Sequence, residues 1–114
     1  MHELSLVASM LDIVADQARQ HSFTTVTCLH VRFGRLSCIE PQALEFALAN
    51  LAPGTPAEGA RMEYEIVAPE IYCFDCEQNV TCESYTATCP VCGGSQVTLC
   101  AGMEELQLVS LDVD

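Results

Sequence analysis

Two pairs of cysteines in the C-terminal half of the chain have the spacing of a metal site. Cys73 and Cys76 form one CxxC pair, Cys89 and Cys92 form the other, and twelve residues separate the two pairs. Each CxxC turn directs two sulfur atoms into the same space, so two such pairs can surround one tetrahedral ion. Four thiolates leave no open position for water or substrate. The spacing therefore predicts a structural zinc site at these four cysteines.

Eight cysteines allow uses other than zinc binding. The same four sulfur atoms could hold iron, as in a rubredoxin, because thiolate geometry does not separate the two metals. Disulfides are a second alternative, but the pairwise spacing and the lack of an export segment favour reduced thiols. The other four cysteines are expected to pack as small apolar residues, with the last two as possible replacement ligands: Cys28, Cys38, Cys82 and Cys100.

His2 offers a different kind of metal site at the start of the sequence. The amine of Met1, the backbone nitrogen and imidazole of His2, and the backbone nitrogen of Glu3 can form a square of four nitrogen atoms. Such a square suits Ni²⁺ or Cu²⁺ better than Zn²⁺, which prefers a tetrahedron. Copper would bind more tightly, so selectivity for nickel has to come from supply and partners. His21 and His30 are expected to be a helix-end residue and a sheet-face residue rather than ligands.

Hydrophobic periodicity predicts the elements that position these sites. Apolar residues at helical spacing indicate an amphipathic helix over residues 4–20, and Pro41 suits the first turn of a second helix that ends before Pro53. Alternating or nearly continuous apolar stretches indicate strands, the second of which has one face in solvent. The predicted strands cover residues 25–33, 61–67 and 106–113.

The order of these elements predicts a discontinuous domain. The last strand is too apolar to stand alone, so it is expected to return and pair with the earlier strands of an α+β domain. Residues 1–68 with 101–114 would then form a nickel-binding domain, and residues 69–100 an inserted zinc-binding domain. A module of this size has little core, and structural zinc contributes about 10 kcal/mol to the folding of small peptides.

Charge and hydropathy exclude several functional classes. The formal net charge is −12, with four arginines and no lysine, so the surface would repel nucleic acid. No apolar run approaches the roughly 20 residues that span a bilayer, and Glu3 does not suit the cationic start of a signal peptide, so a cytoplasmic protein without membrane insertion is expected.

A catalytic triad, a phosphate-binding glycine loop and an HExxH motif are all absent from the sequence. An enzyme is not expected.

Four stretches of the chain occur in a specific order: Met1-His2-Glu3-Leu4-Ser5-Leu6, Gly34-Arg35-Leu36-Ser37, Gly54-Thr55 with Glu58-Gly59, and the two CxxC pairs. Together they resemble the HypA/HybF family of hydrogenase maturation nickel chaperones. Each is weak alone, but their order and spacing are specific, and the match runs nearly end to end. The resemblance implies two helices on a short mixed sheet, with a four-cysteine, zinc-ribbon-like domain inserted before the C-terminal strand.

The same resemblance implies delivery of Ni²⁺ to the large-subunit precursor of [NiFe]-hydrogenase, together with a maturation GTPase of the same pathway. By position, His2 and the backbone of residues 1–3 would hold nickel, and the four CxxC cysteines would hold zinc. Some members carry a histidine in or beside the zinc loops, whereas this chain has none between residues 31 and 114. The alternative is a structural zinc-ribbon protein-interaction module, whose acidic surface docks a basic protein without nickel transfer.

Overall fold

The computed structural model describes residues 2–114, and for His2 only the backbone. The helical elements of this range are α1 (His2–His21), the 3₁₀ helix η1 (Arg35–Ser37) and α2 (Pro41–Leu51). The strands are β1 (Val26–Gly34), β2 (Arg61–Val67), β3 (Glu70–Cys73), β4 (Gln78–Thr81), β5 (Val97–Ala101) and β6 (Gln107–Val113). The helices and long strands predicted from periodicity are all present, and α1 begins two residues earlier than expected.

A mixed sheet of three strands organises the larger part of the molecule. Its order is β2-β1-β6, with β1 in the centre. β1 and β2 run parallel through the crossover that contains α2, whereas β6 returns antiparallel to β1. The expected α+β fold is therefore confirmed, including a last strand that pairs with an earlier one after the cysteine-rich segment.

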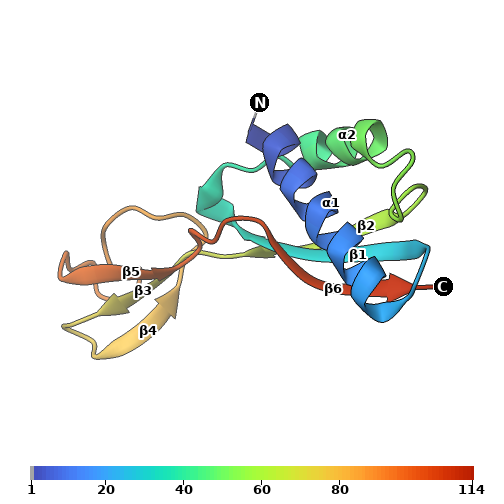
Figure 1. The fold of residues 1–114 in the computed structure, drawn as a ribbon. Helices are drawn as coiled ribbons and strands as arrows, with labels where there is room; N and C mark the ends of the chain where they lie inside the picture. Colours follow the sequence, from blue (N-terminus) through green and yellow to red (C-terminus); the bar gives the residue numbers. More distant parts are fainter. Residues whose placement is uncertain (1) are drawn as a thin grey trace.

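Both helices cover one face of this sheet (Figure 1). Successive side chains of a strand point to opposite faces, so Leu29, Val31 and Phe33 of β1 all point toward the helices. They pack in one core with Val14 of α1 and Leu44 of α2. Within residues 2–114, neither helix is long and apolar enough to cross a membrane.

The second strand departs from its predicted burial. With the glutamates Glu63 and Glu65 on the predicted solvent face, the alternating residues Met62, Tyr64 and Ile66 should form the covered face of β2, but Tyr64 and Ile66 are 41% and 40% exposed. β2 is an edge strand of the sheet: Met62 is half-buried against the main core, and Tyr64 reaches the core only through its ring contact with Phe33, with ring centroids 6.1 Å apart. Periodicity along one strand does not show where that strand lies in the sheet.

A second sheet contains the cysteine-rich segment. Its order is β4-β3-β5, and both pairings are antiparallel. It lies apart from the helices (Figure 1), so the molecule is elongated, with extents of 53 × 27 × 17 Å. Its buried cluster consists of Ile71 and three cysteines, Cys73, Cys82 and Cys89. So small a core agrees with the expectation that this segment needs a metal.

Two chain segments connect the sheets, and they make close contacts with the end of β1. The Gly34 N–H donates to the carbonyl oxygen of Glu104 at 2.8 Å, and the Leu36 N–H donates to that of Gly102 at 2.7 Å. Gly102 has a φ of +105°, and a Cβ there would lie 2.7 Å from Cα of Pro69. Both the backbone conformation and the space at this crossing therefore require glycine.

Candidate metal centres

The four CxxC cysteines occupy two similar turns. Cys73 ends β3 and Cys76 follows in the turn before β4, whereas Cys89 and Cys92 lie in the connection between β4 and β5. A left-handed residue follows each pair directly, Glu77 with a φ of 56° and Gly93 with a φ of 74°. This conformation reverses the chain after the second cysteine, so both sulfur atoms of a pair stay on the same side.

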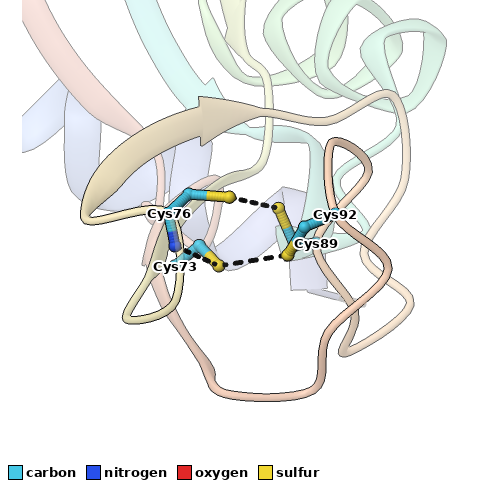
Figure 2. A group of neighbouring side chains, drawn as sticks. All are labelled: Cys73, Cys76, Cys89 and Cys92. Atoms are coloured by element: carbon cyan, nitrogen blue, oxygen red, sulfur yellow. Dashed lines mark hydrogen bonds between the residues drawn. The ribbon is translucent and has the colours of Figure 1, made fainter.

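The four sulfur atoms meet at one point (Figure 2). Sγ of Cys73 lies 3.7 Å from Sγ of Cys92, and Sγ of Cys76 lies 3.9 Å from Sγ of Cys89. Two Zn–S bonds of about 2.3 Å at the tetrahedral angle place their sulfur atoms about 3.8 Å apart. The observed separations therefore fit one tetrahedral ion, and they are far too long for a disulfide. All eight cysteines, which lie within the described residues, are free thiols.

Backbone amides support the sulfur atoms. The Cys76 N–H donates to Sγ of Cys73, and the Gly94 N–H donates to Sγ of Cys92, each at 3.4 Å. A second link within the latter turn runs from the Cys89 N–H to the carbonyl oxygen of Gly94 at 2.8 Å. Amide dipoles directed at sulfur stabilise the thiolate form that a metal requires.

Contacts among the four cysteines give their thiols different pKa values. Hydrogen bonding to the side chain of Cys92, reinforced by Cys73 and by burial, raises the pKa of Cys76 to about 12. A hydrogen bond from the Cys92 backbone lowers the pKa of Cys89 to about 7. The Gly94 backbone opposes a rise at Cys92, but contact with Cys73 and desolvation still raise the pKa of that thiol. Four thiolates so close together need a cation to offset their repulsion.

The remaining cysteines lie outside this sulfur group. Cys82 is buried in the small cluster of the second sheet, as expected for a small apolar residue, and its thiol contacts the carbonyl oxygen of Val80. Cys38 and Cys100 are exposed, so the expectation that they pack as small apolar residues was wrong for these two. Cys28 is buried in the mixed sheet, where it meets His30 and Glu63 in a second group of potential ligands. Sequence spacing did not indicate that group, because its members come from two strands.

The predicted nickel ligands lie largely outside the described residues, since Met1 and the side chain of His2 are not described. What is described is the backbone that would carry them: α1 begins at His2, so the Glu3 amide belongs to its first turn, where amides have no acceptor within the helix. Oε2 of Glu3 accepts the Glu40 N–H at 3.3 Å. Glu40 is the N-cap of α2, so this bond joins the beginnings of the two helices.

Comparison with known proteins decides the family. The family model described as "HypA: Hydrogenase/urease nickel incorporation, metallochaperone, hypA" matches residues 1–113. The chain belongs to the HypA family. The resemblance seen in the sequence is thereby confirmed. The family is one of nickel metallochaperones and is described as such, not as a family of enzymes.

Individual HypA proteins match over the same length. The chain is 45% identical to the hydrogenase maturation factor HypA of Syntrophus aciditrophicus and 39% identical to that of Methylocella silvestris, in each case over 100% of both chains. A solution structure of a HypA protein superposes with a TM-score of 0.72 at 21% identity, covering 99% of this chain and 96% of the other. That of the Ni metallochaperone HypA from Helicobacter pylori gives 0.64 at 18% identity, covering 97% and 96%. These two structures support the HypA fold.

Proposed function

We propose that this chain carries Ni²⁺ at its N-terminus and delivers it to the large-subunit precursor of [NiFe]-hydrogenase. The match to the nickel metallochaperone family over residues 1–113, which include the Met1-His2-Glu3 start, carries this proposal. The His2 imidazole and the backbone of residues 1–3 supply nickel with a planar set of nitrogen ligands. Because first-turn amides have no acceptor within the helix, binding the metal there costs no helical hydrogen bond.

Zinc has a separate, structural role in this proposal. Cys73, Cys76, Cys89 and Cys92 hold one Zn²⁺, and the sulfur separations of 3.7 and 3.9 Å support this assignment. The ion links β3 to the loop before β5 and completes the small buried cluster. On this basis we propose that residues 69–100 form a zinc domain, inserted into a nickel domain of residues 1–68 and 101–114.

The proposed partners follow from the delivery step. The chain acts in the cytoplasm with a maturation GTPase of the same pathway and with the hydrogenase precursor, and it performs no catalysis itself. A net charge of −12 suits docking to basic protein surfaces and opposes binding to nucleic acid. Release on contact with a client requires a site at the edge of the molecule, and the beginning of α1 meets this requirement.

A nickel titration tests the proposal. Untagged protein loaded with zinc is compared with its His2→Ala variant by calorimetry for affinity and by visible absorption for geometry. His21→Ala is the matched control, because this histidine ends the same helix, twenty residues long, at the opposite end. Wild type and His21→Ala are expected to bind about one nickel tightly in a planar nitrogen environment, whereas His2→Ala is expected not to.

A second step tests delivery. The nickel-loaded chain is mixed with the metal-free large-subunit precursor, and nickel in the separated precursor is measured with and without the GTPase. Equal nickel binding by wild type and His2→Ala, or no transfer to the precursor, would favour the alternative of a zinc-ribbon interaction module. An N-terminal extension that blocks the amine provides an independent check. It should abolish tight nickel binding if the chain is a nickel carrier, and it should change nothing if the chain is an interaction module.

A further inference from the structure

The face of the mixed sheet opposite the helices carries three different metal-ligating side chains. Sγ of Cys28, an imidazole nitrogen of His30 and a carboxylate oxygen of Glu63 all lie within 4.8 Å of one another. We propose that these residues bind one divalent ion of the Zn²⁺ or Co²⁺ type, and that Asp112 positions His30 for it. This site does not depend on the proposed nickel carrier function.

Strand register brings the group together. Cys28 and His30 are two residues apart on β1, so their side chains point to the same face, opposite Leu29 and Val31. Glu63 on β2 is the direct cross-strand partner of His30. Asp112 on β6 is the cross-strand partner of Cys28. The central strand thus supplies two ligands, and its two neighbours supply one carboxylate each.

The imidazole and the carboxylate are separated as two ligands of one ion would be. Nδ1 of His30 lies 3.5 Å from Oε2 of Glu63, which is longer than a good hydrogen bond. Nitrogen and oxygen ligands bound at about 2.0 to 2.1 Å in a tetrahedron lie about 3.4 Å apart. The other oxygen, Oε1, lies 3.5 Å from Nε of Arg61. Arg61 therefore lies beside Oε1, and Oε2, the oxygen that faces His30, remains for the ion.

Asp112 acts on the opposite side of the imidazole ring. Its Oδ2 lies 2.9 Å from Nε2 of His30, a good hydrogen-bond distance. A carboxylate there keeps the proton on Nε2 and leaves the lone pair of Nδ1 free to bind metal. Metal-binding histidines commonly have such a partner, and its removal weakens metal binding about 10- to 100-fold. Asp112 is thus a positioning residue rather than a ligand.

Cys28 supplies the buried end of the site. The residue has 0% exposure, and its thiol is 3.8 Å from the carbonyl oxygen of Leu29, a long and weak contact. The side chains of His30 and Glu63 are 32% and 54% exposed, so an ion enters from their side. A surface depression of about 330 Å³, lined by His30, Glu63, Tyr64, Glu65 and Ser110 among others, borders these two residues. It leaves room for a water molecule as the fourth ligand.

The mixture of sulfur, nitrogen and oxygen ligands decides the class of metal. Mg²⁺ and Ca²⁺ prefer oxygen ligands alone, whereas Zn²⁺ and Co²⁺ accept all three types. Three protein ligands with an open fourth position are typical of an accessible zinc site rather than a closed structural one. The proposed site therefore differs in kind from the four-cysteine group, which offers no open position.

Cobalt titration tests this site by itself. The protein carries His2→Ala, which removes the proposed nickel site, and one zinc per chain, which fills the four-cysteine site. Co²⁺ is added, and visible spectra and released zinc are measured. We expect one Co²⁺ per chain with tetrahedral d–d bands and a thiolate-to-cobalt charge-transfer band, without release of zinc. Cobalt signals that grow only as zinc is released would overturn the proposal.

Single substitutions identify the ligands. Glu63→Gln and His30→Gln are each expected to weaken cobalt binding at least about tenfold, and Asp112→Asn about 10- to 100-fold. Cys28→Ser should remove the charge-transfer band. Glu65→Gln is the matched control, because Glu65 is the next residue on this face of β2, opposite Arg32, and its charge change is the same. Equal cobalt affinity in wild type, Glu63→Gln and His30→Gln would exclude the site.

Discussion

Leu36 donates its backbone N–H to the carbonyl oxygen of Gly102 at 2.7 Å, which joins η1, directly after β1, to the segment between β5 and β6. Nη1 of Arg35 adds a bond to the carbonyl oxygen of Glu83 at 3.0 Å. Together with the bond between Gly34 and Glu104, these contacts hold the cysteine-containing sheet against the end of the mixed sheet. The junction consists mainly of backbone groups, so it depends on close approach of the chains.

Gly34→Ala is expected to disturb this junction. A Cβ at Gly34 would lie 2.1 Å from the carbonyl oxygen of Gly102 and 2.6 Å from the nitrogen of Glu104. The φ of Gly34 is −80°, so alanine has no backbone strain there and the effect is purely steric. We expect a loss of about 1 to 3 kcal/mol in the free energy of unfolding, measured by urea denaturation. Amide NMR signals around Gly102 should shift.

Gly59→Ala is the control for that substitution. Gly59 has a φ of +78°, but nothing lies within 4 Å of an added Cβ. Alanine there has a conformational cost of about 1 to 2 kcal/mol without any clash. Its NMR changes should remain near residue 59. If Gly34→Ala also left the signals around Gly102 unchanged, the close packing of the junction would be refuted.

Loss of one zinc ligand is expected to unfold only the cysteine-containing sheet. Three of the four buried residues in its cluster are cysteines, and Cys73 and Cys89 belong both to this cluster and to the sulfur group. Cys73→Ser should abolish zinc binding and collapse the NMR dispersion of residues 69–100. The helices and mixed sheet have a separate core and should keep their signals. Cys38→Ser, a change at an exposed cysteine outside the sulfur group, should alter neither.

Zinc loading is expected to release protons. At pH 7 the Cys76 thiol, with its pKa raised to about 12, is protonated, and Cys89, with its pKa lowered to about 7, is about half ionised. Zinc binds the thiolates, so the bound protons leave as the ion enters. Calorimetry of metal-free protein in buffers of different ionisation enthalpy should detect this release. Zinc affinity should fall on acidification, more steeply below pH 7, where Cys89 also becomes protonated. A constant affinity between pH 8 and 6 would contradict the four-thiolate site.

Glu3→Ala is expected to loosen the contact between the beginnings of the two helices. It removes the acceptor of the Glu40 N–H, a bond of 3.3 Å that caps α2 from another helix. By analogy with N-cap residues, the loss should be about 1 kcal/mol in the free energy of unfolding. Glu3→Gln keeps an acceptor oxygen and should lose less. Equal stability of all three proteins would show that this bond makes no net contribution.

Nickel affinity is expected to fall between about pH 7 and 6. Imidazole and terminal amine groups have reference pKa values of about 6.5 and 8, so protons compete with the metal for both ligands on acidification. Competition with a coloured nickel chelator at several pH values measures the change. An affinity that stays constant over this range would rule out the proposed ligand set of His2 and the backbone of residues 1–3.

The sequence alone determined the features that depend on local spacing. Each CxxC turn brings its own two sulfur atoms close together, so two such pairs can be recognised from their spacing as one potential metal site. The helix that contains Pro41 in its first turn and ends before Pro53 was predicted correctly, since proline in the first turn and the apolar stripe are properties of nearby positions. Family membership could also be predicted from the sequence, because the identifying stretches are short and keep their order along the chain.

Only the tertiary structure decided the features that depend on strand register and position in the sheet. Cys28 and Glu63 lie on different strands, and no periodicity indicates that His30 lies opposite Glu63 and beside Asp112. Likewise, Tyr64 is exposed because β2 is an edge strand. A shift of one residue in the pairing would turn every side chain of that strand to the other face. The packing of segments far apart in the chain sets this register, and local sequence does not encode it.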